Sequence, residues 1–232
     1  AAALETGMHI WWLGQSGFLV CHAGRCLLFD PYLSDSLTKK YAGTDKPHDR
    51  LTELVVAPGR LDFIDVLTSS HNHTDHLDSD TLGPVLAASP QARLVLLRAN
   101  VAFAAQRLGK AAHERFVPLA DGEAQRAGPF TFTAVPAAHE QLAPEFGGFV
   151  ATVGPFRIYH SGDTILFPGM EARLKAQAID VAFLPINGRA PERRRPPRRE
   201  AREPHPAPGR TAQGDGFRHR ARGRLGPCED AR

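Results

Sequence analysis

The sequence predicts a mixed α/β fold, in which a β-sandwich carries helices on both outer faces. Blocks of β-branched and aromatic residues alternate along the chain with segments bounded by helix start and stop signals. The length of 232 residues suits one domain with a sizeable core. A His-rich loop directly follows the apolar segment 63–68, and ligands of α/β sheets usually bind at the carboxyl ends of strands.

The first half of the chain is expected to begin with a meander of three strands and a long polar loop. A later strand leads into the His-rich loop, and a helix follows, with Ser79 or Asp80 available to cap its amino end. Asn100 is expected to cap a second helix that runs to Leu108 and stops at Gly109. The strands are expected over residues 8–13, 18–21, 26–29, 63–68 and 93–97, and the helices over 79–88 and 101–108.

The second half of the chain adds another block of strands and one helix. Most of its strand segments are short runs that begin with an aromatic residue. This interleaving of strand blocks with helices is what favours a sandwich covered by helices. The strands are expected over residues 116–119, 130–135, 149–153, 156–160 and 181–184, and the helix over 170–178.

Four potential metal ligands lie within six positions of the loop after segment 63–68. His71 and His73 can point the same way as two arms of one site, while Asp75 and His76 can face a second ion. Two-metal hydrolases hold their ions about 3.5–4 Å apart. Imidazole and carboxylate suit zinc, manganese or iron, and a loop without thiolate is unlike a purely structural zinc site. The competing interpretation is a solvated His-rich loop that binds nothing.

Five motifs, in the same order along the chain, resemble the metallo-β-lactamase superfamily. The pattern H-x-H-x-D-H after a hydrophobic strand is the hallmark of that superfamily, and the opening segments resemble the branch related to L-ascorbate-6-phosphate lactonase. The matching segments are WLGQSGF with LFDPY at 12–18 and 28–32, HNHTDH at 71–76, AAHE at 137–140, YHSGDT at 159–164 and LPING at 184–188.

The resemblance implies a four-layer αββα sandwich of metallo-β-lactamase type. It also implies a hydrolase with two divalent metal ions, zinc or manganese, with iron as a further option. Asp75 would accept the proton of a metal-activated water, and the substrate would be a small anionic lactone, ester or phosphoester. The implied ligands are His71, His73 and His139 for one metal, Asp75 and His76 for the second, and Asp163 as the bridge between them.

One further ligand of the superfamily, a histidine on a late loop, has no counterpart in this sequence. His205 and His219 are the only late histidines, and neither has the expected surroundings. His139 has an alternative interpretation as an ordinary strand-end histidine, and Asp163 as a turn residue. Asp30 is expected to be structural, holding the loop that follows its strand.

Composition favours a cytoplasmic protein without a membrane span. No run approaches the ~18 apolar residues of a transmembrane helix, and no signal-peptide pattern opens the chain. Cys21 and Cys26 flank a turn and are interpreted as small apolar strand residues, and the three cysteines, with Cys228, cannot all pair. A reducing setting fits this usage. The oligomeric state is not predicted.

Residues 190–232 differ in composition from residues 1–189, which are expected to form the metallo-β-lactamase-like domain. This tail holds twelve of the 28 Lys and Arg residues and seven of the 19 prolines. It is predicted to be disordered, or an out-of-frame translation of a GC-rich gene that leaves the sandwich incomplete at its C-terminal end. The alternative is a basic arm for nucleic acid, which makes a catalytically silent binding or regulatory protein, or a nuclease, the second functional hypothesis.

Overall fold

The computed structural model describes residues 7–185 except 46, 49 and 51, all within the first of two units, Ala1–Arg193. The first sheet has the strand order β1-β2-β3-β4-β5-β6. β1, β2 and β3 form an antiparallel meander, and β3 to β6 run parallel to one another. The strands are β1 (Met8–Gly14), β2 (Gly17–His22), β3 (Arg25–Phe29), β4 (Val66–Ser69), β5 (Arg93–Leu97) and β6 (Phe116–Leu119).

The second sheet has the strand order β11-β10-β9-β8-β7. Its neighbours are antiparallel except β10 and β11, which are parallel. β8 and β9 extend past their predicted ends, because the hairpin between them continues to the pair Ala138 and Leu142. The strands are β7 (Ala124–Ala127), β8 (Phe130–Ala138), β9 (Leu142–Val153), β10 (Phe156–His160) and β11 (Val181–Phe183).

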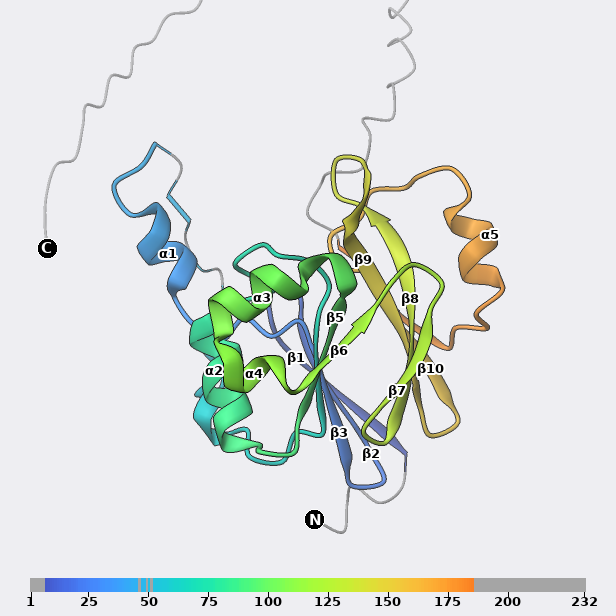
Figure 1. Cartoon of the computed structure of the whole chain (residues 1–232), viewed down its shortest axis with the longest axis horizontal. Helices are drawn as coiled ribbons and strands as arrows, with labels where there is room; N and C mark the ends of the chain where they lie inside the picture. Colours follow the sequence, from blue (N-terminus) through green and yellow to red (C-terminus); the bar gives the residue numbers. More distant parts are fainter. Residues whose placement is uncertain (1–6, 46, 49, 51, 186–232) are drawn as a thin grey trace, which may run out of the picture. The chain divides into compact units, whose positions relative to one another are not determined.

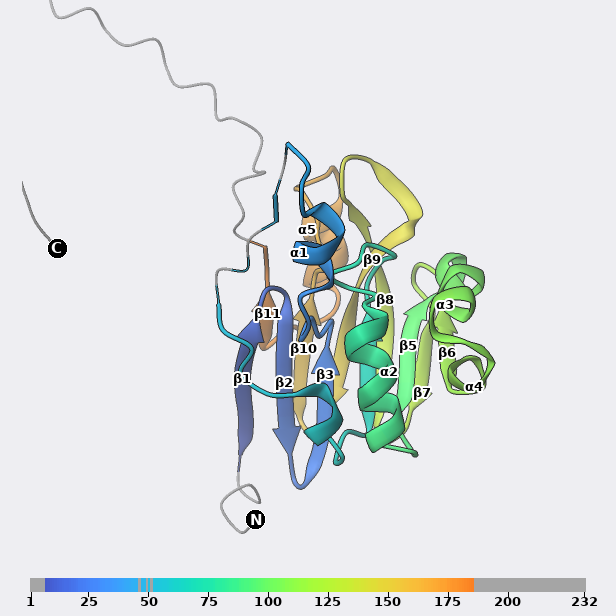
Figure 2. The same ribbon diagram turned by 90° about the vertical axis from the view of Figure 1, so that its left-hand side faces the viewer.

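Helices cover the outer face of each sheet, as Figure 1 shows. Turning the molecule brings the helices on the first sheet into view (Figure 2). The short α1 and the 3₁₀ segment η2 lie in the connection between β3 and β4, and η3 precedes α3. The helical segments are α1 (Ser36–Tyr41), η2 (Pro58–Arg60), α2 (Ser79–Ala88), η3 (Arg98–Asn100), α3 (Val101–Leu108), α4 (Lys110–His113) and α5 (Met170–Lys175).

Three apolar clusters separate the four layers. Side chains alternate along each strand, so Leu27 and Phe29 of β3 face the second sheet while Leu28 between them faces the helices. Outside the second sheet, Tyr159 packs in a smaller cluster with Met170 of α5. This helix–sheet–sheet–helix order confirms the predicted αββα fold class. The incompleteness expected at the C-terminal end concerns residues outside the described part of the chain.

Local details depart from the predicted elements where side-chain hydrogen bonds compete with the pattern. β4 begins three residues late: residues 62 and 63 form a turn, and the Asp65 carboxylate accepts from the backbone N–H of Cys26 just before the strand starts. The residue that caps α2 is Asp78, whereas Ser79 or Asp80 was predicted. Asn100 occupies the N-cap position of α3, but its side chain donates to the Glu145 carbonyl oxygen.

The interpretation of Cys21 and Cys26 as plain apolar residues is corrected by the structure. Both side chains are buried in their strands, as expected, but they form a disulfide. The register of the β2–β3 hairpin places the two residues directly opposite each other, with Cα atoms 4.2 Å apart. Sequence spacing alone does not reveal this register. His205, His219 and Cys228 lie outside the described residues.

Candidate metal centre

The predicted site residues come from three strand ends at one end of the sandwich. β4 ends at Ser69 and leads into the loop that carries His71 and His73. β8 ends directly before His139, and β10 ends three residues before Asp163. Parallel β4 and antiparallel β8 therefore deliver side chains from both sheets to one place.

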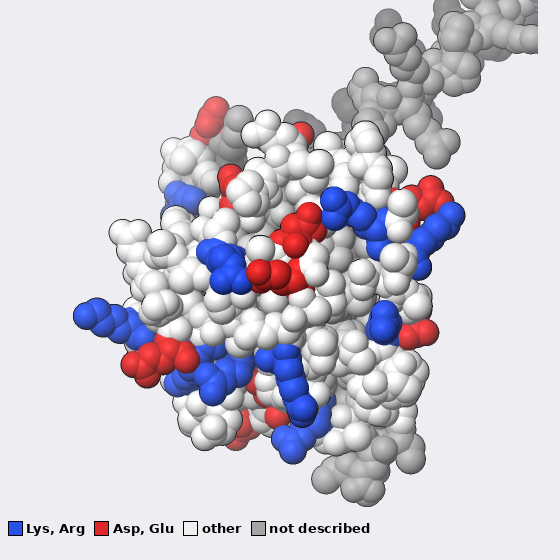
Figure 3. Space-filling view, turned by 45° about the vertical axis from the view of Figure 1, so that its right-hand side comes forward, with Lys and Arg blue, Asp and Glu red and all other residues white. Residues whose placement is uncertain are grey.

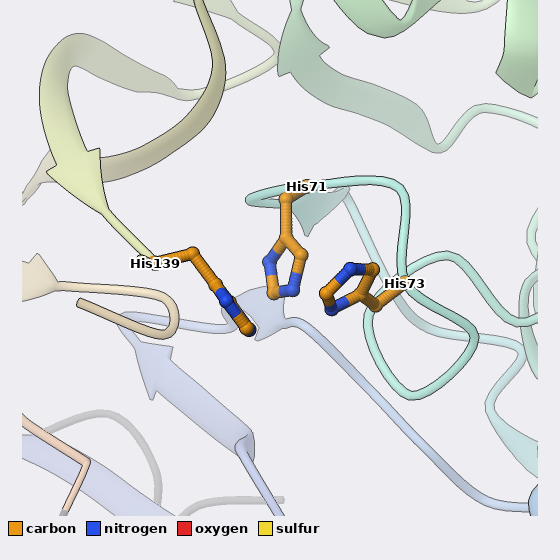
Figure 4. A group of neighbouring side chains, drawn as sticks. All are labelled: His71, His73 and His139. Atoms are coloured by element: carbon orange, nitrogen blue, oxygen red, sulfur yellow. The ribbon is translucent and has the colours of Figure 1, made fainter. Parts of the chain in front are cut away.

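His71, His73 and His139 form one compact group. Their ligand atoms all lie within 4.8 Å of one another. Two ligands of one tetrahedral zinc ion at ~2.0–2.1 Å lie about 3.4 Å apart, so small movements bring this group to that spacing. Figure 4 shows the three rings turned toward one another, one from the end of β8 and two from the loop. Phe146 stacks on His139 with ring centroids 5.2 Å apart and closes one side of the group.

A second group consists of His71, His76 and Asp163, whose ligand atoms also lie within 4.8 Å of one another. Asp163, a member of the second group, also faces the first, and His71 belongs to both. Oδ1 of Asp163 is 3.5 Å from Nε2 of His76, and its Oδ2 is 3.8 Å from Nε2 of His139. One carboxylate thus faces histidines of both groups, as a bridging ligand must.

Asp75 belongs to neither group but borders the second. Its Oδ2 lies 3.7 Å from Nε2 of His76 and accepts a hydrogen bond of 3.1 Å from the Gln15 side-chain amide. Gln15 comes from the β1–β2 turn, inside the motif that resembles the lactonase branch. It was not among the predicted site residues, although its position in that motif was available as a signal.

Asp30 is the second residue that sequence reasoning did not place in the site. It is fully buried, and its Oδ2 lies 2.7 Å from Nδ1 of His76. The same carboxylate accepts from the Thr68 hydroxyl at 2.6 Å and from the Ser70 backbone N–H and hydroxyl. Carboxylates that bind the second nitrogen of a ligating histidine fix its orientation and tautomer.

A glycine allows the loop after β10 to approach the His-rich loop closely. Gly162 has a φ of +57°, a conformation that L side chains rarely adopt. A Cβ there would lie 2.6 Å from the Gly147 carbonyl oxygen and 2.7 Å from Cβ of Ser70. The position therefore needs glycine, and glycine there is what brings Asp163 beside His71.

Charge and burial give the site residues distinct protonation states. Burial lowers the pKa of His71 to about 2, which leaves its imidazole neutral. Burial also lowers the pKa of His76, but the Asp163 and Asp30 carboxylates outweigh it and hold that pKa well above its usual value. Burial raises the pKa of Asp163, yet His76 and its neighbours outweigh that effect and the pKa lies well below normal. A cation at these atoms would take the place of the proton on His76.

Two observations make these residues a good fit for metal ions. The Nε2 atoms of His71 and His76 are buried and have no hydrogen-bond partner among the described residues. An unsatisfied buried nitrogen costs about 1–3 kcal/mol, and coordination would remove that cost. The donor set of neutral imidazoles and carboxylates is the one that zinc, manganese and iron accept.

Comparisons with known proteins identify the family. Residues 25–214 match the family described as the β-lactamase superfamily domain. A protein of Azorhizobium caulinodans named UPF0173 metal-dependent hydrolase is 29% identical over 191 residues, covering 78% of this chain and 74% of the relative. A protein of the same name from Enterococcus faecalis is 31% identical over 173 residues, covering 70% of this chain and 66% of the relative.

A solved structure of similar fold is a possible metal-dependent hydrolase from Veillonella parvula. It superposes with a TM-score of 0.57 at 17% identity and covers 77% of this chain and 70% of the other. At this identity the likeness concerns the fold alone, and it agrees with the two-sheet architecture. The family match over most of the length, with the fold and the His/Asp cluster, shows that the chain belongs to the metallo-β-lactamase superfamily, among relatives named metal-dependent hydrolases.

Proposed function

We propose that the protein is a metal-dependent hydrolase that uses two divalent metal ions, zinc or manganese, with iron also compatible. The observation that carries the proposal is the placement of Asp163 between His76 and His139, with its oxygens 3.5 Å from Nε2 of His76 and 3.8 Å from Nε2 of His139. The names of the relatives support hydrolysis as the reaction class. The proposed ligands are His71, His73 and His139 for one metal and Asp75 and His76 for the other, with Asp163 shared.

The protein's own residues prepare this site for hydrolysis. When bound, the metal ions supply a Lewis acid and lower the pKa of a water molecule toward 7. Asp75 acts as the proton acceptor, and the Gln15 amide holds one of its oxygens by the 3.1 Å hydrogen bond, so the other stays available. Asp30 binds Nδ1 of His76, so that Nε2 of the same ring faces Asp163 and Asp75.

The proposed substrate is a small anionic lactone, ester or phosphoester. The motifs at 12–18 and 28–32 support an enzyme similar to the L-ascorbate-6-phosphate lactonase branch. The curated relatives carry the broader name of metal-dependent hydrolases, so the branch is part of the proposal.

The test compares the metal-free protein with protein reloaded with zinc, manganese or ferrous iron. Metal content is measured by mass spectrometry, and turnover is measured on 4-nitrophenyl acetate and bis(4-nitrophenyl) phosphate. We expect 4-nitrophenyl acetate to be hydrolysed only after metal is added. His73→Ala should lose metal and activity, whereas His113→Ala, at an exposed histidine of α4, should keep both. Full metal loading without turnover of either compound would contradict a hydrolase.

The alternative, a nucleic-acid-binding protein on the same fold, rests on the arginines of residues 190–232. Residues 1–189 carry sixteen Lys and Arg against nineteen Asp and Glu, a net charge of −3. On the face in Figure 3, blue and red side chains lie interspersed among white ones, without a broad basic patch. Strongly salt-dependent binding of nucleic acid without turnover would favour the alternative.

A further inference from the structure

A cavity of about 620 Å³ adjoins the candidate metal centre. Asp163 and Gln15 both line it, and these two residues also contact the metal site through His76 and Asp75. Aromatic side chains form much of the remaining wall, among them Trp12 and Phe18. The cavity therefore has the position and the apolar lining expected of a substrate pocket.

Arg50 is the only lysine or arginine among the described residues that line this cavity. Its guanidinium lies over the Tyr32 ring, 5.1 Å from the centroid, and its Nη2 donates to the Tyr32 carbonyl oxygen at 3.0 Å. Tyr32 is itself buried, and its hydroxyl accepts from the Leu37 backbone N–H at 2.9 Å. These contacts hold the guanidinium in place before any ligand arrives.

The charge of Arg50 has no carboxylate partner in the described part of the chain. Asp163 is the only carboxylate among the described residues that line the cavity. Its ion pairs are with His76 and His139 at the metal site, and none is with Arg50. The buried Nε of Arg50 has no hydrogen-bond partner among the described residues. An arginine that is held by an aromatic ring and a carbonyl oxygen, and that keeps its Nε donor unsatisfied and its charge unpaired among the described residues, is suited to bind an oxyanion.

Arg50 and the metal site both lie next to the β1–β2 turn. An ideal Cβ on Gly14 would lie 3.5 Å from Nη2 of Arg50, so the guanidinium lies against the β1–β2 turn. The next residue of that turn, Gln15, donates to Asp75. A substrate held by Arg50 at one end can therefore reach the residues proposed to perform the hydrolysis.

We infer that Arg50 binds an oxyanion of the substrate, a carboxylate or phosphate separate from the bond that is cleaved, while the aromatic wall takes the apolar body. This inference rests on the proposed hydrolase function and adds the residue that selects the substrate. A bidentate guanidinium–oxyanion contact is strong enough to change specificity by about tenfold or more.

The test uses the metal-loaded full chain and three esters of one shape: phenyl acetate, 4-acetoxybenzoate and 4-acetoxyphenyl phosphate. We expect kcat/KM to be about tenfold or more higher for at least one anionic ester than for phenyl acetate. Arg50→Ala should bring that ratio close to one, mainly through KM, and Arg50→Lys should retain part of it. Arg60→Ala, at an exposed arginine of η2, is the matched control and should keep the full ratio.

The outcomes separate this inference from the proposed function. Turnover of all three esters with equal kcat/KM, or a ratio that survives Arg50→Ala, would overturn the role of Arg50 and leave the hydrolase proposal intact.

If no ester is turned over, the hydrolase proposal fails, and binding of 4-hydroxybenzoate and phenyl phosphate is then measured by calorimetry. Binding of either that weakens about tenfold in Arg50→Ala supports the anion site. Equal affinity in Arg50→Ala and Arg60→Ala overturns it. The relative affinity of the two compounds tells carboxylate from phosphate.

Discussion

Nδ1 of His76 lies 2.7 Å from Oδ2 of Asp30, and both side chains are almost completely buried. Because Asp30 occupies Nδ1, the Nε2 atom is the one that faces Asp163 and Asp75. The hydroxyl of Thr68 and the backbone N–H of Ser70 hold the carboxylate in turn. We therefore propose that Asp30 acts on the candidate metal centre through His76, without being a ligand itself.

Replacing Asp30 by Asn should weaken metal binding at His76 by about 10–100-fold, the usual effect of losing an outer partner of a ligand. Metal affinity is measured by competition with a fluorescent chelator. Asp62→Asn, at an exposed position, is the control and should bind metal as the wild type does. Unchanged affinity in Asp30→Asn, with the fold intact by circular dichroism, would return Asp30 to the structural role expected from the sequence.

Replacing Asp163 by Ala should remove bound metal and activity together. Asp163 faces histidines of both groups, so its loss affects both proposed ions. We expect turnover to fall by more than roughly 100-fold, beyond the range typical of outer-shell partners. Metal content by mass spectrometry and kcat with a chromogenic ester are measured side by side, with Asp62→Ala as the control. Normal metal content in Asp163→Ala would show that Asp163 is only a turn residue.

The Cys21–Cys26 disulfide predicts the thiol count of the native protein. Of three cysteines, only one should react with an alkylating reagent before reduction, and all three after it. The disulfide closes a short loop, so Cys21→Ala with Cys26→Ala should cost at most about 2 kcal/mol of unfolding free energy. Urea unfolding of both forms measures this difference. Three reactive thiols in the protein as isolated from cells would instead favour the reducing, cytoplasmic setting predicted from the sequence.

The sequence predicted most residues of the candidate site because they are clustered in one loop or occur in motifs that resemble a known family. His71, His73 and His76 are neighbours in one loop, and that loop follows an apolar strand. His139 and Asp163 lie far along the chain, and only the resemblance to a family placed them with the others. The sequence around His139 and Asp163 does not indicate which strand ends lie close together in the fold.

Asp30 shows what sequence reasoning could not supply. Its role depends on the parallel pairing of β3 with β4, which brings it next to Thr68, 38 residues away. No periodicity in either strand specifies that pairing. β7 was missed for a different reason: three of the four residues in Ala124–Ala127 are exposed, so the strand has no apolar pattern. The disulfide was missed because it depends on hairpin register.

The last prediction concerns residues 190–232, which lie outside the described part of the chain. Two large apolar residues, Phe217 and Leu225, must anchor 43 positions, and such a segment cannot bury enough surface to offset its ordering entropy. We propose that a shifted reading frame produced it, although the family match continues to residue 214. The DNA sequence of codons 188–232 decides the matter: the shifted frame should encode the histidine that the superfamily carries on a late loop.

Restoring that frame should strengthen binding of the second metal, which then gains a neutral ligand, and should raise solubility and turnover. A chain cut after Arg189 is the control, and it should bind metal and turn over esters as the full chain does, because the shifted segment contributes no ligand. Metal titration and soluble yield are compared across the three chains. If the DNA offers no such alternative frame, or if the cut chain loses metal binding, the frameshift account is wrong and residues 190–232 belong to the working protein.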